Sequence, residues 1–151
     1  VYKDLFMQAA NDSSYSVAGA ALLALNELDG KEALAIAKKL AKEETKGRLK
    51  AAINAVFMKN GDETTYEIFD KLSLQEKFGS LTGFVEFLGK ETNAKNFTGG
   101  VDMLLKLKRE IPASARQQTD PFINMQLKGL ADKKSAAGAK ELADYILEKI
   151  K

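Results

Sequence analysis

Acidic side chains occur in adjacent pairs that could bind a metal ion or exchange protons. The clearest pairs are Glu43-Glu44 and Asp62-Glu63. A calcium loop alternates Asp or Asn with other residues before a closing Glu, and neither pair has that spacing. The chain has no His and no Cys, which removes the common ligands of zinc, the usual general base and the thiol nucleophile. Both pairs are therefore interpreted as solvated helix surface or helix caps, and we predict no metal site.

Hydroxyl groups are the next candidates for chemistry. Three serines surround one tyrosine near the start of the chain: Ser13, Ser14, Ser16 and Tyr15. No His is available to activate them, and no Gly-x-Ser-x-Gly turn occurs. Ser135 could pair with Lys133 or Lys134, but its position indicates an exposed helix start. We predict no catalytic serine.

Two further patterns have a chemical and a structural interpretation. Glu86 lies among Phe84, Val85 and Phe87, where burial would raise its carboxyl pKa and suit acid–base work; the simpler interpretation is that it points outward. Gly99-Gly100 precedes an apolar helix and could present free N–H groups to an anion, although no Walker pattern follows.

Glycine and aromatic spacing point to packing more than to ligand binding. Gly79-x-x-x-Gly83 favours the close approach of a neighbouring helix. An aromatic group could line a peptide groove, but a core position is favoured for Phe78, Phe84, Phe87 and Phe97. The three arginines could grip a carboxylate of a partner, and nothing in the sequence selects among Arg48, Arg109 and Arg116. We therefore assign no catalytic, cofactor-binding or metal-binding residue.

Composition describes the scaffold that would position such residues. The chain has 151 residues, 45% hydrophobic and 29% charged, with a net charge of +2. This length and mixture are typical of a folded domain with a real core. The charges are evenly spread and no apolar run is long enough for a membrane span, so we expect neither a nucleic acid nor a membrane as partner.

Apolar residues recur with the spacing of one helix face, and no convincing alternating strand appears. The stripes comprise Ala18, Ala21, Leu22, Leu25 and Leu28; Leu34, Ala37, Leu40 and Ala41; Leu49, Ala52, Ile53, Val56 and Phe57; Phe78, Leu81, Val85 and Leu88; Val101, Leu104, Leu105 and Lys108; and Leu142, Tyr145 and Ile146. This pattern predicts eight or nine helices. The segment from Ile111 to Gln118 fits poorly and is interpreted as a loop or a short broken helix.

Helix ends are marked by capping and glycine signals. Ser13-Ser14 can begin the helix that holds Leu22. Asp29-Gly30 and Asn60-Gly61 each predict a helix end with a left-handed glycine, and Asp62 then caps the following helix. Leu88-Gly89-Lys90 predicts a third end. Two later starts are predicted at Thr119-Asp120-Pro121, with proline in the first turn, and at Ser135.

These breaks recur about every thirty residues, an interval within the range of helical repeats. Ala24 to Leu40 resembles Ala55 to Leu72, each a helix end, a tight turn and a new helix. We predict an all-α fold in which antiparallel helix pairs stack as a HEAT-like right-handed superhelix, forming one domain over residues 1–151. A compact helical bundle is the alternative.

Three segments carry a family resemblance: Ala20 to Leu34, Phe57 to Asp62, and Phe84 to Leu88. Together they resemble the HEAT-like helical C-terminal domain of zinc aminopeptidases of the aminopeptidase N family, bacterial members in particular. The resemblance covers about residues 2–130. A start within a helical pattern and a basic C-terminal helix end fit a C-terminal piece of a longer enzyme.

The resemblance implies a non-catalytic domain that packs on the catalytic domain of the same parent chain, encloses the peptide chamber and receives peptide on its concave face. Zinc is expected in the parent enzyme, on a His-Glu-x-x-His helix, with a Gly-x-Met-Glu-Asn segment for the substrate amine. Neither motif is present here, so no zinc or catalytic residue carries over. A stand-alone HEAT-like or tetratricopeptide-like interaction module is the alternative, and periplasmic, secreted and cytoplasmic locations all remain open.

Overall fold

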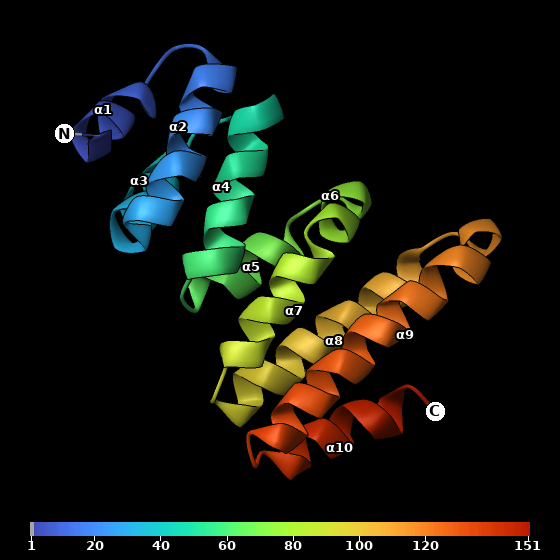
Figure 1. The fold of residues 1–151 in the computed structure, drawn as a ribbon. Coiled ribbons are helices and arrows are strands. Elements are labelled where there is room, and N and C mark those ends of the chain that lie inside the picture. The colour runs from blue at the N-terminus through green and yellow to red at the C-terminus, as the bar shows by residue number, and fades with distance from the viewer. Residues whose placement is uncertain (1) are drawn as a thin grey trace. The chain divides into compact units, whose positions relative to one another are not determined.

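The computed structural model describes residues 2–151, which form ten α-helices and no β-strand (Figure 1). The all-α prediction is confirmed, with one or two helices more than expected. The chain divides into two compact units, residues 1–69 and 70–151, called here the N-terminal and C-terminal units. The single domain and the right-handed superhelix stay predictions.

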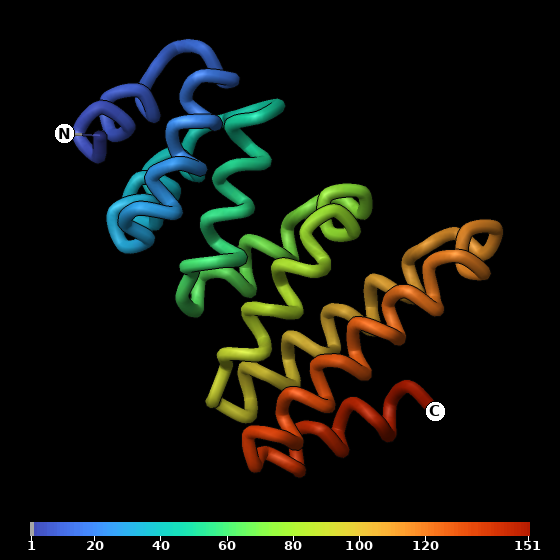
Figure 2. Tube along the Cα trace, in the orientation of Figure 1, coloured from blue at the N-terminus to red at the C-terminus, as the bar shows by residue number. Residues whose placement is uncertain are grey.

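The N-terminal unit holds five helices, the last of which ends at the boundary: α1 (Tyr2–Ala9), α2 (Tyr15–Leu28), α3 (Gly30–Leu40), α4 (Gly47–Asn60) and α5 (Thr64–Asp70). Helix α2 packs against α1, α3 and α4, and α3 also packs against α4. Gly19 of α2 lies beside the start of α4, and Asn26 lies beside Asn60 at its end. Helices α2 and α4 therefore run side by side in the same direction (Figure 2).

Aspartates form the two corners of this unit. Asp29 ends α2 and caps α3, since its carboxylate accepts from the N–H of Glu32 at 3.1 Å. Asp62 precedes α5 and accepts from the N–H of Thr64 at 3.0 Å, as predicted. Ser14 caps α2, also as predicted, by accepting from the N–H of Val17. Short polar side chains therefore supply the partners that the first helical N–H groups lack.

The prediction of left-handed glycines at these corners is wrong. Gly30 is the first residue of α3, and Gly61 has φ −69° and ψ 171°. Gly61 is needed for space instead, because a Cβ there would lie 2.1 Å from the carbonyl oxygen of Phe57 and 1.9 Å from the hydroxyl of Thr65. The left-handed glycine that ends a helix is Gly138, with φ +84°.

The C-terminal unit holds α6 (Leu74–Gly79), α7 (Leu81–Lys90), α8 (Ala94–Glu110), α9 (Ala113–Ala136) and α10 (Lys140–Lys149). Helix α9 packs against α7, α8 and α10, and α6 packs against α7 and α8. The buried face of α9 carries Ile123, Leu127 and Leu130, each at most 2% exposed. The predicted helix end at Leu88-Gly89-Lys90 is confirmed.

Three predicted boundaries are wrong in this unit, because α9 is one continuous helix. It begins at Ala113, so most of the segment from Ile111 to Gln118 is helical. Pro121 lies inside the helix rather than at its start, and Thr119 donates its hydroxyl to the carbonyl of Ala115 instead of capping a new helix. Ser135 also lies inside α9, and the last helix begins at Lys140.

Two glycine predictions are corrected as well. Gly99 and Gly100 lie in the second turn of α8, which begins at Ala94, so their N–H groups are past the unbonded first turn of the helix. This position removes the proposed anion site. Gly79 ends α6 and Gly83 lies in α7, so these two residues do not share a helix face.

Most predicted core residues are buried. The stripe on α4 is confirmed in full, with Leu49, Ala52, Ile53, Val56 and Phe57 at most 4% exposed. Leu28, Ala41 and Phe78 depart from the prediction, because all three are exposed, Leu28 at 59% and Phe78 at 37%. Leu28 and Phe78 stand at or near the end of a helix, and the ring centre of Phe78 lies 5.8 Å from that of Phe122 in α9.

Candidate functional site

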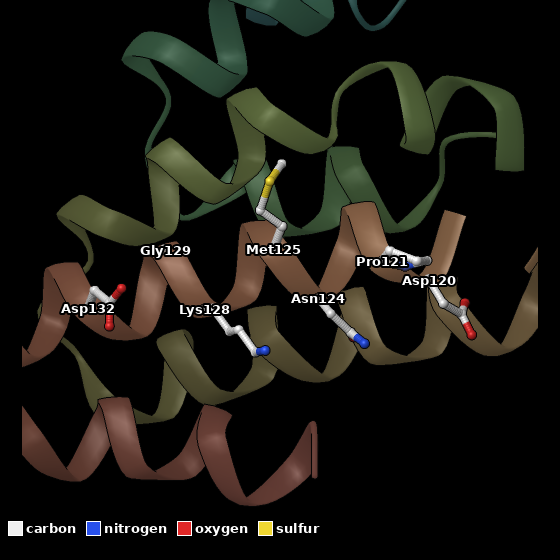
Figure 3. A pocket seen from close by; sticks show the side chains of 7 residues that line it. All are labelled: Asp120, Pro121, Asn124, Met125, Lys128, Gly129 and Asp132. Carbon is white, nitrogen blue, oxygen red and sulfur yellow. The ribbon is translucent and has the colours of Figure 1, made fainter. Parts of the chain in front are cut away.

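A hollow runs along the exposed side of α9 (Figure 3). It has a volume of about 690 Å³ and is lined by Asp120, Pro121, Asn124, Met125, Lys128, Gly129 and Asp132. These residues lie three or four positions apart, so one face of the helix supplies the whole lining. The hollow is open to solvent and its largest apolar side chain, Met125, is 58% exposed.

A smaller hollow of about 170 Å³ adjoins it over α7 and α9. It is lined by Val85, Glu86, Met125, Gln126, Gly129, Leu130 and Lys133. Met125 and Gly129 line both hollows, and a Cβ at Gly129 would meet no atom within 4 Å. A continuous shallow strip of mixed polarity therefore follows α9.

The charged groups of this strip are arranged in a row and do not converge. Asp120 and Asp132 stand twelve residues apart on one helix, a separation of about 18 Å, which is too long for a carboxylate pair that shares a proton. Lys108 of α8 donates to the side-chain oxygen of Asn124 at 2.8 Å. One oxygen of Asp120, Oδ1, is buried and has no hydrogen-bond partner among the described residues. The strip can contact an extended or helical segment, but its geometry offers no acid–base pair.

The corner aspartates of the N-terminal unit have a second set of polar contacts. Lys3 of α1 lies 2.6 Å from Asp29, and Lys38 of α3 lies 2.5 Å from Asp62. The bond from Lys38, followed by the one from Thr64, lowers the pKa of Asp62 to about 2. The bond from Lys3 likewise lowers the pKa of the Asp29 carboxyl and raises that of Lys3. The lysine at each corner thus comes from the helix before the two that the corner joins, Lys3 from α1 and Lys38 from α3.

Two asparagines join the ends of α2 and α4. The amide of Asn60 donates to the side-chain oxygen of Asn26 at 2.5 Å, and Asn26 is 6% exposed. Beside this contact, the adjacent residues Lys59 and Glu27 form an ion pair. These contacts link the first helix of one helix–corner–helix unit to the first helix of the next.

Lys134 is the most unusual titratable residue in the C-terminal unit. It is 5% exposed, and its ammonium donates to the carbonyls of Gly89 at 3.2 Å and Glu91 at 2.5 Å, at the end of α7. The ammonium also lies 5.0 Å from the ring centre of Phe97. Burial lowers the pKa of Lys134. A cation at a helix C-terminus is favoured by the helix dipole, so this lysine closes α7.

The residues singled out for chemistry are not brought together. Glu43 and Glu44 are exposed after α3, and Asp62 is used at a corner. Ser135 is exposed while its neighbour Lys134 is buried against α7, so the two do not pair. Glu86 is exposed, as the simpler interpretation predicted.

The aromatic and arginine candidates likewise do not come together in one site. Phe84 and Phe97 are fully buried core residues, and Phe87 stacks on Phe84 with ring centres 6.2 Å apart. Arg116 donates to the carbonyls of Ile111 and Arg109, which ties it to the end of α8. Arg48 and Arg109 are exposed.

Sequence reasoning missed the Asn26–Asn60 contact, the buried Lys134 and the hollow on α9. The recurrence of Asn near two helix ends is the one signal that could have revealed the first. Lys134 is indistinguishable in the sequence from Lys133, and only the neighbouring helices separate them.

Comparison of the chain with protein-family models, curated proteins and solved structures gave no match. Within residues 2–151, no three acidic side chains lie close enough together to hold a metal ion. In the same range, no helix has the length and apolar character needed to cross a bilayer.

Proposed function

We propose that this chain is a helical-repeat domain of a zinc aminopeptidase, which packs on the catalytic domain and forms part of the wall of the peptide chamber. The observation that carries the proposal is the set of polar contacts between successive helix–corner–helix units. Asn60 bonds to Asn26, and Lys38 bonds to the next corner at Asp62. Stacked helix pairs of this kind are the architecture that the resemblance implies.

The contribution of such a domain would be geometric. A wall limits which peptides enter only if its helices keep their spacing. The α2–α4 contact is close at its start, where Gly19 meets the backbone of Arg48, and is hydrogen-bonded at its end by Asn26 and Asn60. Two attachment points along one helix resist both sliding and splaying. This stiffness supports a role as scaffold.

Zinc does not fit the donor groups of this chain. The family's metal site uses two histidines and a glutamate, and the chain has no His and no Cys. The metal of the parent enzyme would be held by residues outside these 151. The chain's own share of the proposed function is therefore enclosure of the peptide and contact with the catalytic domain.

The gene that encodes this chain provides the test. A His-Glu-x-x-His sequence with a distant Glu, encoded upstream of Val1, is the expected result. The purified 151-residue chain with added zinc should leave aminoacyl anilides intact, while the parent protein cleaves them. An unrelated upstream region, or a parent without zinc-dependent cleavage, would overturn the proposal.

An interaction module of the HEAT or tetratricopeptide type is the second candidate. It is favoured by six large exposed apolar residues on α1 and α2: Tyr2, Leu5, Tyr15, Val17, Leu23 and Leu28. This function predicts a protein partner that binds without the catalytic domain. Affinity capture compares the whole chain with a chain that lacks α1. A partner lost with α1, together with an unrelated upstream sequence, would favour the interaction module over the aminopeptidase domain.

A further inference from the structure

Asn60 and Gly61 form a dipeptide in which the asparagine side-chain amide is chemically labile. Glycine has no Cβ to hinder its own backbone nitrogen, so this nitrogen can reach the side-chain carbonyl carbon of the preceding asparagine and close a five-membered ring. The pair is the only Asn-Gly in the sequence, and it stands at the corner between α4 and α5 (Figure 1). This reactivity is therefore confined to one joint of the N-terminal unit.

The nitrogen that would attack is occupied in the folded corner. The N–H of Gly61 donates to the carbonyl of Phe57 at 3.0 Å. The same carbonyl accepts the hydroxyl of Thr65 at 3.0 Å, and Thr65 is fully buried. Attack requires the Gly61 nitrogen to turn towards Asn60 and to lose its proton. The bond to Phe57 must therefore break before the ring can close.

The side chain that would be attacked is fixed as well. The amide nitrogen of Asn60 donates to the side-chain oxygen of Asn26 at 2.5 Å and lies 3.5 Å from the backbone carbonyl oxygen of Asn26. A backbone carbonyl can only accept, which sets the orientation of the amide. A Cβ on Gly30 would lie 2.6 Å from Cγ of Asn60, so the side chain also packs on the first residue of α3.

The corresponding corner at Asp29-Gly30 is protected in another way. Gly30 is the first residue of α3, so its N–H belongs to the unbonded first turn and is not retained by the helix. The ammonium of Lys3, 2.6 Å from Asp29, lowers the pKa of that carboxyl and keeps it ionised. An ionised carboxylate resists attack by a nitrogen nucleophile. Protection by conformation is therefore particular to the asparagine corner.

We propose that Asn60 is a modification site that reacts only when the α4–α5 corner opens, and that its conversion to isoaspartate prevents the corner from closing again. In the first step, the nitrogen of Gly61 bonds to Cγ of Asn60 and gives its proton to solvent, while the side-chain amide nitrogen leaves as ammonia. Water then adds to either carbonyl of the cyclic imide and opens it to aspartate or isoaspartate. No oxidant or cofactor is needed.

The isoaspartate product does not fit the closed corner. It lengthens the main chain by one carbon atom immediately before Gly61. A Cβ at Gly61 would already lie 1.9 Å from the hydroxyl of Thr65 and 2.1 Å from the carbonyl oxygen of Phe57, so the corner has no space for an added atom. The new carboxylate also has no N–H to donate to Asn26. The reaction therefore removes the hydrogen-bonded end of the α2–α4 contact irreversibly.

Incubation of the intact 151-residue chain in neutral buffer, with and without denaturing urea, provides the test. Liquid chromatography and mass spectrometry separate peptides that contain asparagine, aspartate or isoaspartate at residue 60. The folded chain should form product at least about tenfold more slowly than the unfolded chain. Asn60→Gln places the side-chain carbonyl one bond further from Gly61 and should abolish the product in both conditions.

Variants identify the corner as the gate. Gly30→Ala would push the Asn60 side chain away from Asn26, and Asn26→Ala removes the acceptor itself. Each should raise the rate in the folded chain about fivefold, the factor expected for the loss of one hydrogen bond. Hydrogen exchange of the Gly61 amide should accelerate by the same factor, because it requires the same bond to break. Circular dichroism establishes that each variant is folded.

Matched controls separate opening of the corner from unfolding of the whole unit. Asn54→Ala removes a second buried asparagine of α4, which is 8% exposed. Gly99→Ala adds a carbon atom inside α8, where no atom lies within 4 Å. Both variants should keep the reaction rate of the unchanged chain.

Three results would overturn the proposal. Equal rates in the folded and unfolded chain would mean that the corner does not protect Asn60. Equal acceleration by Asn26→Ala and Asn54→Ala would assign the reaction to unfolding of the whole unit. Purified isoaspartate product with the amide protection of the unmodified chain would show that the corner closes around the modified residue. None of these results bears on whether the upstream sequence encodes a zinc aminopeptidase.

Discussion

The contacts that stabilise the N-terminal unit differ in kind from those that stabilise the C-terminal unit. In the N-terminal unit, polar side chains at the corners bond from one helix pair to the next, as Asn60 does to Asn26 and Lys38 to Asp62. In the C-terminal unit, one long helix, α9, packs against three others through buried aliphatic residues. The first arrangement divides stability among short, repeated contacts, while the second concentrates it in one element.

This difference predicts where single substitutions act most strongly. A corner has little room, because backbone and side chains of two helices meet within a few residues. The long helix has an exposed side, where space is free, and a buried side on which the ammonium of Lys134 bonds to the end of α7. The following changes test the contrast, and amide hydrogen exchange can report each unit separately.

Gly61→Ala should give the largest loss. The added methyl group would lie 2.1 Å from the carbonyl oxygen of Phe57, and main chain cannot move aside as a flexible side chain does. We expect a loss of about 3 kcal/mol in the protection of N-terminal unit amides. Gly99→Ala is the matched control: it meets no atom within 4 Å inside α8 and should stabilise the C-terminal unit by about 0.5–1 kcal/mol. Equal effects of the two changes would contradict the contrast.

Lys134→Met should be the most damaging of these changes in the C-terminal unit. Methionine keeps the apolar stem but leaves the carbonyls of Gly89 and Glu91 without the ammonium, and removes the cation from Phe97. We expect the free energy of unfolding in urea to fall by about 2 kcal/mol. In hydrogen exchange, the amides of α7 and α9 should lose the most protection. The neighbouring Lys133→Met changes an exposed lysine and should cost much less. A similar loss for both would mean that Lys134 is held by packing of its stem alone.

Pro121→Ala should act in the opposite direction. Proline inside α9 cannot donate to the carbonyl four residues earlier, and its ring crowds that turn. Since the helix is continuous through this position, alanine should restore the bond and stabilise the unit by about 1 kcal/mol, raising the melting temperature. Pro112→Ala, at the cap before α9, removes no internal helix bond and serves as control. Destabilisation by Pro121→Ala would show that α9 needs the local geometry that proline imposes.

The same contrast explains what the sequence could predict. Helical periodicity and caps such as Ser14 and Asp62 act within one turn, so they are legible in the chain and correct in the structure. Pro121 and Ser135 were misread as helix starts because their local preference is overridden by the packing of α9 on three neighbours. Gly30 and Gly61 were correctly placed at corners, but their reason is close approach of Asn60 and Phe57, which is a tertiary fact.

The candidate surfaces were harder to predict than the fold. Leu23 and Leu28 look like core residues in a leucine-rich helix, and only the positions of α1, α3 and α4 leave them exposed. Lys134 differs from Lys133 by a rotation of about 100° around the helix, which decides between burial and solvent. A single sequence contains the periodicity but not the identity of the neighbour that covers each face.

The smallest expected effect concerns the charge at the second corner. The bond from Lys38 lowers the pKa of Asp62 from 3.8 to about 2, so between these pH values the unfolded chain binds more protons than the folded one. Stability from this carboxylate is therefore fully present above pH 5 and is lost as the pH falls toward 2. Because the Asp62 side chain is nearly half exposed, screening by solvent reduces the contribution to about 0.5 kcal/mol.

Asp62→Asn should lower the urea unfolding free energy by that amount at pH 6 and by almost nothing at pH 2. Lys38→Met should remove most of the same pH-dependent difference, and a double variant no worse than either single one would assign the effect to the pair. A pH dependence that persists in Lys38→Met would instead assign it to the capping bond with Thr64.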